Sequence, residues 1–172
     1  NIKITAVASD FDFLGASMAA AEGEAFLYGI QHAIENQTPF LCISAGGGMR
    51  MMESLISLSQ MTRTTLAINE LKKNSFVINT LIHNASILVP TPFIHTTEKI
   101  WDQTMKVTLE SGFLLSKYVW EDMSSNKDGV IIFVSSKAGL EGFEDETAYC
   151  AAKHGLEGLM KSLAIEGMKN KI

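Results

Sequence analysis

Short apolar runs alternate along the chain with longer stretches in which apolar side chains recur every three or four residues. The short runs predict buried strands, and the longer stretches predict amphipathic helices. The expected strands are residues 3–11, 40–44, 76–83 and 129–135. The expected helices are residues 17–36, 49–73, 98–123 and 148–169. The chain therefore alternates strand and helix from end to end, in the order βαβαβαβα.

This alternation predicts an α/β fold: a parallel sheet with helices on both faces. Because residues 76–83 read as an apolar strand rather than a linker, we expect one continuous sheet that passes through this strand. The chain is then a single α/β domain of residues 1–172. The long connection 84–97 leaves the carboxyl end of a strand, where α/β proteins place their sites.

Composition narrows the class of protein. The chain has 172 residues, of which 47% are hydrophobic and 19% charged, and this favours a globular domain with a real core. A net charge of −5 without a basic cluster argues against nucleic acid or an anionic membrane as partner. The expected partner is a small-molecule substrate. The first residue is Asn1 rather than methionine, which suggests a processed or excised piece.

Location and metal binding follow from what the chain lacks. No apolar run reaches the ~18 residues that a membrane span needs, and no signal-like start is present, so we expect a cytoplasmic protein. Cys42 and Cys150 are too far apart in sequence for a zinc knuckle and are expected to be reduced thiols. The histidines show no metal-ligand spacing, and we expect no metal site. They are His32, His83, His95 and His154.

A tyrosine and a lysine stand one helical turn apart at the start of the last expected helix. Tyr149 and Lys153 therefore share one face of that helix, where the cation makes the phenol a better acid. Ser136 follows the fourth strand and Asn84 follows the third. Because the carboxyl ends of parallel strands meet at one sheet edge, Ser136, Tyr149 and Lys153 are expected to converge.

These stretches resemble the short-chain dehydrogenase/reductase family over roughly residues 80–172. The motifs that carry the resemblance are "LIHNAS" (81–86), "FVSSKAG" (133–139) and "YCAAK" (149–153). A lone Tyr-x-x-x-Lys is a weak signal, and its alternative is a half-buried tyrosine beside a solvated lysine. The serine stretch at the right distance and the upstream Asn-Ala turn make the combination specific.

The resemblance implies a role for each matching residue. Tyr149 would be the general acid/base at a carbonyl or alcohol, and Lys153 would activate it and hold the nicotinamide ribose. Ser136 would hydrogen-bond the substrate oxygen. Asn84 and Ala85 would line the edge of an NAD or NADP cofactor.

The chain also departs from the family pattern at several positions. Thr108 stands where the family has a catalytic asparagine, and Ser86 where it has a glycine. The family's dinucleotide turn, Thr-Gly-x-x-x-Gly-x-Gly, lets pyrophosphate approach a helix N-terminus. No such spacing occurs in the chain, so cofactor binding is expected to be impaired.

The first part of the chain resembles a different family. "SDFDFLGASMAAAEGEAF" (9–26) and "CISAGGGMRMMESLISLSQM" (42–61) resemble the carboxyltransferase β subunit of bacterial acetyl-CoA carboxylase, a crotonase-like fold, over about residues 1–79. This resemblance implies that Gly46, Gly47 and Gly48 form an oxyanion-type set of N–H donors for a CoA thioester. The alternative is a strand-to-helix turn whose glycines only permit close packing.

The two resemblances meet near residues 79–80, so the chain is interpreted as a Rossmann-like half fused to a crotonase-like half. Three functions stay open. The first is an incomplete nicotinamide-dependent carbonyl/alcohol oxidoreductase, impaired or inactive. The second is an acyl-CoA-binding carboxyltransferase fragment, and the third a chimeric α/β fold without activity. Exposed sheet edges favour a homo-oligomer in each case.

Overall fold

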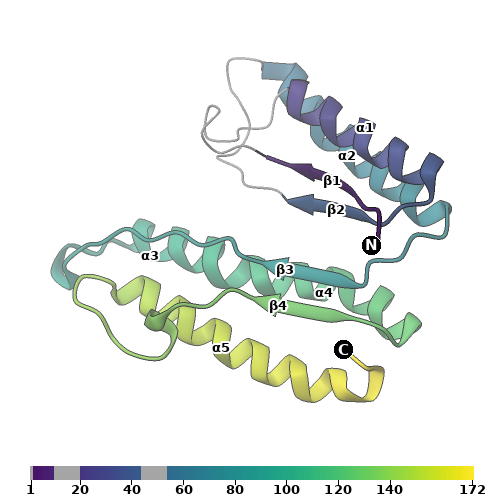
Figure 1. Cartoon of the computed structure of the whole chain (residues 1–172). Helices are drawn as coiled ribbons and strands as arrows, with labels where there is room; N and C mark the ends of the chain where they lie inside the picture. Colours follow the sequence, from purple (N-terminus) through teal and green to yellow (C-terminus); the bar gives the residue numbers. More distant parts are fainter. Residues whose placement is uncertain (1, 10–19, 44–53) are drawn as a thin grey trace. The chain divides into compact units, whose positions relative to one another are not determined.

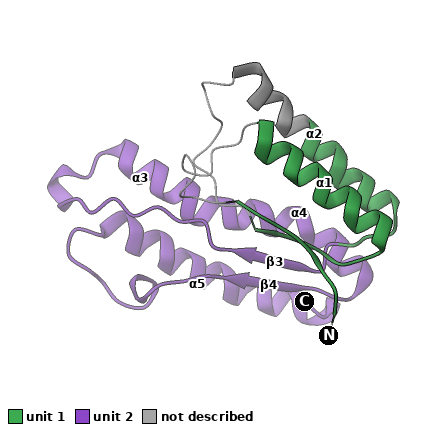
Figure 2. Ribbon diagram, turned by 45° about the horizontal axis from the view of Figure 1, so that its top comes forward, with its two compact units in different colours: residues 1–77 green, residues 78–172 purple. Residues whose placement is uncertain are grey.

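The strands of the chain pair in parallel, and each pair belongs to a different part of the fold. The computed structural model describes residues 2–9, 20–43 and 54–172, and for residues 54–62 it describes the helix but not the side chains. It divides into unit 1, residues 1–77, and unit 2, residues 78–172 (Figure 2). The single domain and the seam near residues 79–80 remain predictions.

Unit 1 is a parallel strand pair with helices packed beside it. Its elements are β1 (Thr5–Ala8), α1 (Ala20–Asn36), β2 (Phe40–Ile43) and α2 (Ser54–Lys73) (Figure 1). Thr5 lies opposite Phe40 in the β1–β2 ladder, and α1 packs against both β1 and α2. A Cβ added to Gly29 of α1 would clash with the Val7 side chain of β1. The close approach of helix to strand therefore requires glycine at this position.

Unit 2 contains the second strand pair and most of the candidate site. Its elements are β3 (Thr80–His83), the 3-10 helix η3 (Phe93–His95), α3 (Glu98–Met105), the π-helical turn η4 (Lys106–Glu110), α4 (Ser111–Asn126), β4 (Val130–Phe133), the 3-10 turn η5 (Lys137–Gly139), α5 (Thr147–Gly167) and the 3-10 turn η6 (Met168–Asn170) (Figure 1). In the β3–β4 ladder His83 lies opposite Phe133. The buried side chains Met123 and Leu156, from α4 and α5, contribute to the core of this unit.

Each unit has its own parallel strand pair, and the expected continuous sheet remains a prediction. β1 pairs with β2 and β3 pairs with β4. The third strand begins only at Thr80 rather than at residue 76. One reason is local: the N–H of Phe76 donates to the carbonyl of Leu71, 3.1 Å away, and so still belongs to the end of α2.

The helices of unit 2 pack on one face of its sheet. A Cβ on Gly112 of α4 would lie 3.2 Å from Phe133 Cε1 and 3.4 Å from His83 Cε1, so α4 packs on the face that carries these two rings. The alternate side chains, Ile82, Val130 and Ile132, are between 44% and 55% exposed. The α/β class and parallel pairing are confirmed, and the two-sided covering is not seen within this unit.

The helix expected over residues 98–123 contains a π-helical turn that the periodicity does not predict. α3, η4 and α4 follow one another without a break from Glu98 to Asn126. The N–H of Ser111 donates to the carbonyl of Lys106, five residues back, instead of the carbonyl four residues back. The turn therefore adds one residue to the helical repeat in the middle of this run.

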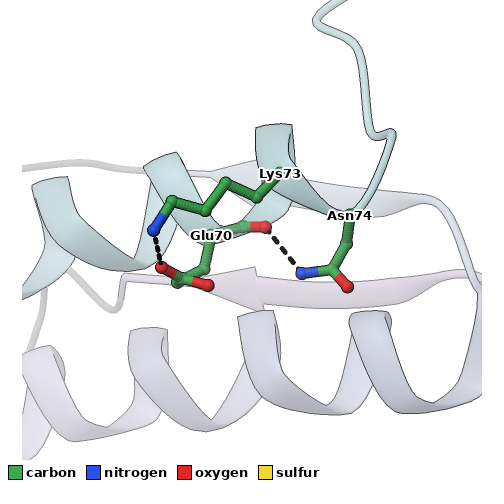
Figure 3. A network of polar contacts seen from close by, with 3 residues as sticks. All are labelled: Glu70, Lys73 and Asn74. Atoms are coloured by element: carbon green, nitrogen blue, oxygen red, sulfur yellow. Dashed lines mark hydrogen bonds and ion pairs between the residues drawn. The ribbon is translucent and has the colours of Figure 1, made fainter.

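Several helices end in the same turn, with a left-handed residue that is not glycine. After α2, Ser75 has a φ of 67°, its N–H donates to Lys72 O, and Phe76 N–H donates to Leu71 O. This is the hydrogen-bond pattern of a Schellman motif. At the same helix end the Lys73 ammonium pairs with Glu70, while Asn74 Nδ2 donates to the Glu70 carbonyl at 2.9 Å (Figure 3). The same motif recurs at Gln37 after α1 and at Lys127 after α4.

Candidate functional site

The site in unit 2 is centred on a buried lysine. Lys153 lies on α5 and is only 2% exposed, and its Nζ donates to the Val134 carbonyl at 2.7 Å, just after β4. Nζ also lies 5.6 Å from the centroid of the half-buried Tyr149 ring, one helical turn earlier. Burial lowers the pKa of the Lys153 ammonium. The tyrosine–lysine pairing predicted from spacing is therefore present, and the alternative of a solvated lysine is wrong.

Ser136 lies on the segment that packs against the lysine turn. It caps η5, where its Oγ accepts a hydrogen bond of 3.2 Å from the Ala138 N–H. A Cβ on Gly139 would lie 3.2 Å from the Lys153 carbonyl, so η5 approaches α5 closely at this point. The structure thus brings the Ser136 segment against the helical turn that carries Lys153. The Ser136 hydroxyl keeps its proton to donate, because its bond to Ala138 uses only a lone pair.

Thr108 lies inside the π-helical turn and is fully buried. Its Oγ1 accepts a hydrogen bond of 3.2 Å from the N–H of Ile87, in the segment that follows β3. The Thr108 hydroxyl therefore holds this segment against the helix. Asn84 and Ala85, predicted to line the cofactor edge, lie directly after β3 and are exposed.

His83 is a site neighbour that sequence reasoning misses, because the sequence shows only a histidine without metal-ligand spacing. It is buried at the end of β3, its Nε2 lies 2.8 Å from Ser111 Oγ, and its ring meets Phe133 edge-on at 5.9 Å. Burial first, and the charge of Lys153 second, lower the pKa of His83. The one available signal is its position immediately before the Asn-Ala turn, at the strand end.

Other predicted features lie elsewhere. Gly46, Gly47 and Gly48, the predicted oxyanion-type donors, lie outside the described residues. In the described ranges, no three potential metal-binding side chains cluster together, and no helix has the length and hydropathy to cross a membrane. Two open hollows lie between helix pairs. Unit 1 has one between α1 and α2, and unit 2 has one between α4 and α5 that Trp120 and Leu163 help to line. Neither hollow is lined by Tyr149, Lys153 or Ser136.

The donor set at the site can be compared with what a nicotinamide cofactor needs. One of the three N–H groups of Lys153 is used by Val134, which leaves two that suit ribose hydroxyls, and Tyr149 brings a phenol. These residues fit the nicotinamide end of a dinucleotide. The pyrophosphate end has no matching glycine spacing in the sequence.

Comparison with known proteins gives two kinds of match. The model of the short chain dehydrogenase family matches residues 40–172. Two solved structures are similar over most of the chain. A 4-hydroxyisoleucine dehydrogenase complexed with NADH is 26% identical, with a TM-score of 0.59 over 83% of this chain and 64% of that one. A metagenomic short-chain oxidoreductase in complex with NADP is 25% identical, with a TM-score of 0.59 over 91% of this chain and 67% of that one.

The curated relatives are carboxyl transferase β subunits rather than dehydrogenases. The β subunit of the acetyl-coenzyme A carboxylase carboxyl transferase from Pelagibacter ubique is 81% identical over 75 residues, which is 44% of this chain and 24% of that protein. The same subunit from Azorhizobium caulinodans is 33% identical over 136 residues, which is 70% of this chain and 46% of that protein. The chain thus spans a quarter to a half of these relatives.

The two kinds of match overlap along the sequence. The family match begins at residue 40, well before the expected seam, and an alignment that covers 70% of the chain extends past residue 79. Both families build parallel strand–helix units, so one apolar pattern can align with either. The resemblances to both families are confirmed, with broader boundaries than the motifs alone suggest.

Proposed function

The chain belongs to the short-chain dehydrogenase family, and on that premise we propose that unit 2 carries the proton-transfer site of a nicotinamide-dependent oxidoreductase acting on a carbonyl or alcohol. The observation that carries the proposal is the Tyr149–Lys153 pair, with the ammonium buried and anchored to the end of β4. A buried cation beside a phenol is the arrangement that proton transfer to a substrate oxygen needs.

The proposed role of each side chain in proton transfer follows from the hydrogen-bond donors that it has available. Tyr149 would donate its phenolic proton to the carbonyl oxygen, and the Lys153 ammonium would stabilise the phenolate that remains. Ser136 would donate its hydroxyl proton in a hydrogen bond to the same oxygen, because its bond to Ala138 uses only a lone pair. A bound reduced nicotinamide would supply the hydride to the carbonyl carbon. In the alcohol direction each proton moves the opposite way.

We propose further that the cofactor is held chiefly at its nicotinamide end, so that turnover is slow. Holding reacting atoms in place contributes up to ~7–11 kcal/mol to such a reaction. Lys153 is buried rather than exposed, so its contact with a ribose is worth more than the ~1 kcal/mol of a surface ion pair. One lysine still does not replace the N–H groups of a pyrophosphate turn.

The test follows the absorbance of NADH and NADPH with acetoacetyl-type and aromatic ketones, comparing the unsubstituted chain with Tyr149→Phe. We expect slow oxidation that disappears in the variant, since the variant keeps the ring but loses the proton. Oxidation at equal rates in both proteins would overturn the oxidoreductase assignment and favour a hybrid fold without activity. Fast oxidation that depends on Tyr149 would support the assignment and overturn the proposed weakness of cofactor binding.

A second candidate function rests on the 81% identity to a carboxyl transferase β subunit over 75 residues. On this alternative, Gly46, Gly47 and Gly48 offer N–H donors to the carbonyl of a CoA thioester. Identity at this level favours recent joining of a carboxyltransferase segment to a dehydrogenase segment, whether by gene rearrangement, metagenomic joining or construction. Binding of CoA thioesters separates this candidate from the first.

A further inference from the structure

The hydrogen bonds around His83 determine which of its ring nitrogens carries the proton. In an α-helix the Val107 carbonyl would accept from the Ser111 N–H, but in η4 that N–H donates to Lys106 instead. The Ser111 hydroxyl takes its place and donates to the Val107 carbonyl at 2.7 Å. A hydroxyl has one proton to give, so its 2.8 Å contact with His83 must be one in which the histidine donates.

His83 is therefore protonated at Nε2. Its other nitrogen, Nδ1, is buried and makes no hydrogen bond in the described structure. A second proton there would add a charge in a buried position near the Lys153 ammonium. The neighbours that face the ring from β4 and α4 are Phe133 and Ser111, which offer no negative charge in compensation. The neutral Nε2–H form is the one that fits.

The same histidine is connected to the lysine by two routes. Along the backbone, the His83 carbonyl accepts from the Val134 N–H at 2.9 Å, and the Val134 carbonyl accepts from Lys153 Nζ. Through its side chain, His83 holds Ser111 and with it the π-helical turn. That turn packs on α5: a Cβ on Gly155, two residues after Lys153, would lie 2.7 Å from Leu109 Cδ2.

We propose that His83 is a positioning residue for the Tyr149–Lys153 site, and that its neutral Nε2–H form keeps the π-helical turn in place against α5. The proposal rests on the proposed function, because it concerns the geometry of that proton-transfer site. It assigns no contact between His83 and substrate. The ring acts through Ser111, and through the turn that carries Thr108 and Leu109.

The first measurement is ¹⁵N NMR of the His83 ring between about pH 5 and about pH 8, the range in which an ordinary histidine titrates. We expect the Nε2–H tautomer, with a pKa for protonation of Nδ1 below the ordinary histidine value. The Nδ1–H tautomer, or a doubly protonated ring near neutral pH, would overturn the proposal.

The second measurement compares His83→Phe, His83→Gln and Ser111→Ala by hydrogen exchange of the Ser111 amide. Phenylalanine keeps the packing on Phe133 but has no donor, whereas the glutamine amide can donate from near the Nε2 position. Loss of one hydrogen bond should speed exchange about 10-fold in His83→Phe and in Ser111→Ala, and His83→Gln should restore most of the protection. Exchange unchanged in His83→Phe, or unrestored in His83→Gln, would overturn the proposal.

The third measurement is the Tyr149-dependent rate in the same variants. It should fall about 10-fold in His83→Phe and recover in His83→Gln, with the change in kcat rather than in KM. A Tyr149-dependent rate that stays unchanged in His83→Phe would overturn the positioning role. If the unsubstituted chain has no such rate, the proposed function fails, whereas the tautomer and exchange results still decide whether His83 holds the turn.

Discussion

Lys153 and Val134, nineteen residues apart in sequence, are joined by a hydrogen bond from the lysine Nζ to the backbone carbonyl. The buried ammonium is thus held by a peptide dipole, and no carboxylate in the described part of the chain forms an ion pair with it. Burying such a charge is costly, and the cost appears as the lowered pKa of the lysine. The arrangement holds a cation near the phenol of Tyr149 at the expense of stability.

Lys153→Met tests this balance. The pKa of Lys153 is lower in the folded chain than in the unfolded chain, so between these two pKa values the unfolded chain binds more protons. The free energy of unfolding therefore rises with pH in this range, up to the ordinary lysine pKa of ~10.4. Methionine keeps the aliphatic packing, removes the charge and leaves the Val134 carbonyl unpaired. We expect a net change within about 2 kcal/mol at neutral pH, and loss of the pH-dependent rise.

Urea unfolding near neutral pH and near pH ~10 measures the effect. Lys161→Met, at an exposed position of the same helix, is the matched control and should follow the unsubstituted chain at both pH values. Parallel stability changes in the unsubstituted chain and in Lys153→Met would contradict the lowered pKa.

Lys127→Gly should stabilise the chain. Lys127 ends α4 with a φ of 51°, a left-handed conformation that costs a residue with a Cβ about 1 kcal/mol and costs glycine almost nothing. We expect a gain of about 1 kcal/mol in thermal or urea unfolding. Lys117→Gly, at an exposed interior position of the same helix, should lose about 1 kcal/mol. Stability changes of the same sign in both variants would contradict the left-handed conformation of Lys127.

Gly129→Ala should destabilise unit 2. The added Cβ would lie 2.7 Å from Met123 Cβ, an atom that is buried and tied to the helix backbone and so has little room to move. We expect a loss of about 1–3 kcal/mol in urea unfolding. Gly158→Ala, where the new Cβ on α5 would meet nothing within 4 Å beyond its chain neighbours and its own helix backbone, should instead gain about 0.5–1 kcal/mol. Equal effects at the two glycines would show that the Met123 contact is looser than described.

Acetyl-CoA and malonyl-CoA should bind weakly. On the carboxyltransferase alternative one glycine turn would offer N–H donors, while a dissociation constant of ~10 µM needs ~7 kcal/mol and so contacts to the rest of the ligand as well. Calorimetry should therefore give constants weaker than ~10 µM for both. Free CoA is the control, because it separates recognition of the thioester from recognition of the nucleotide. Dissociation constants below ~10 µM for the thioesters, together with weaker binding of free CoA, would favour the carboxyltransferase candidate.

The sequence by itself determined the order of strands and helices and the chemistry at the strand ends. Apolar periodicity is a local property, so it located β2 and α5 closely, and helical spacing alone put Tyr149 beside Lys153. The serine-bearing segment was likewise placed correctly beside the start of α5, because parallel strands end at one edge.

Only the tertiary structure decided the pairing of strands and the environment of each polar group. A strand pattern does not say which strand it pairs with, and the structure pairs β1 with β2 and β3 with β4. The π-helical turn lies inside one unbroken helical run, so the periodicity does not reveal it, nor the bond between Ser111 and His83. From sequence alone a lysine side chain is expected to be exposed to solvent. The burial of Lys153 came from α5 packing against the end of β4, and that packing joins residues far apart in the chain.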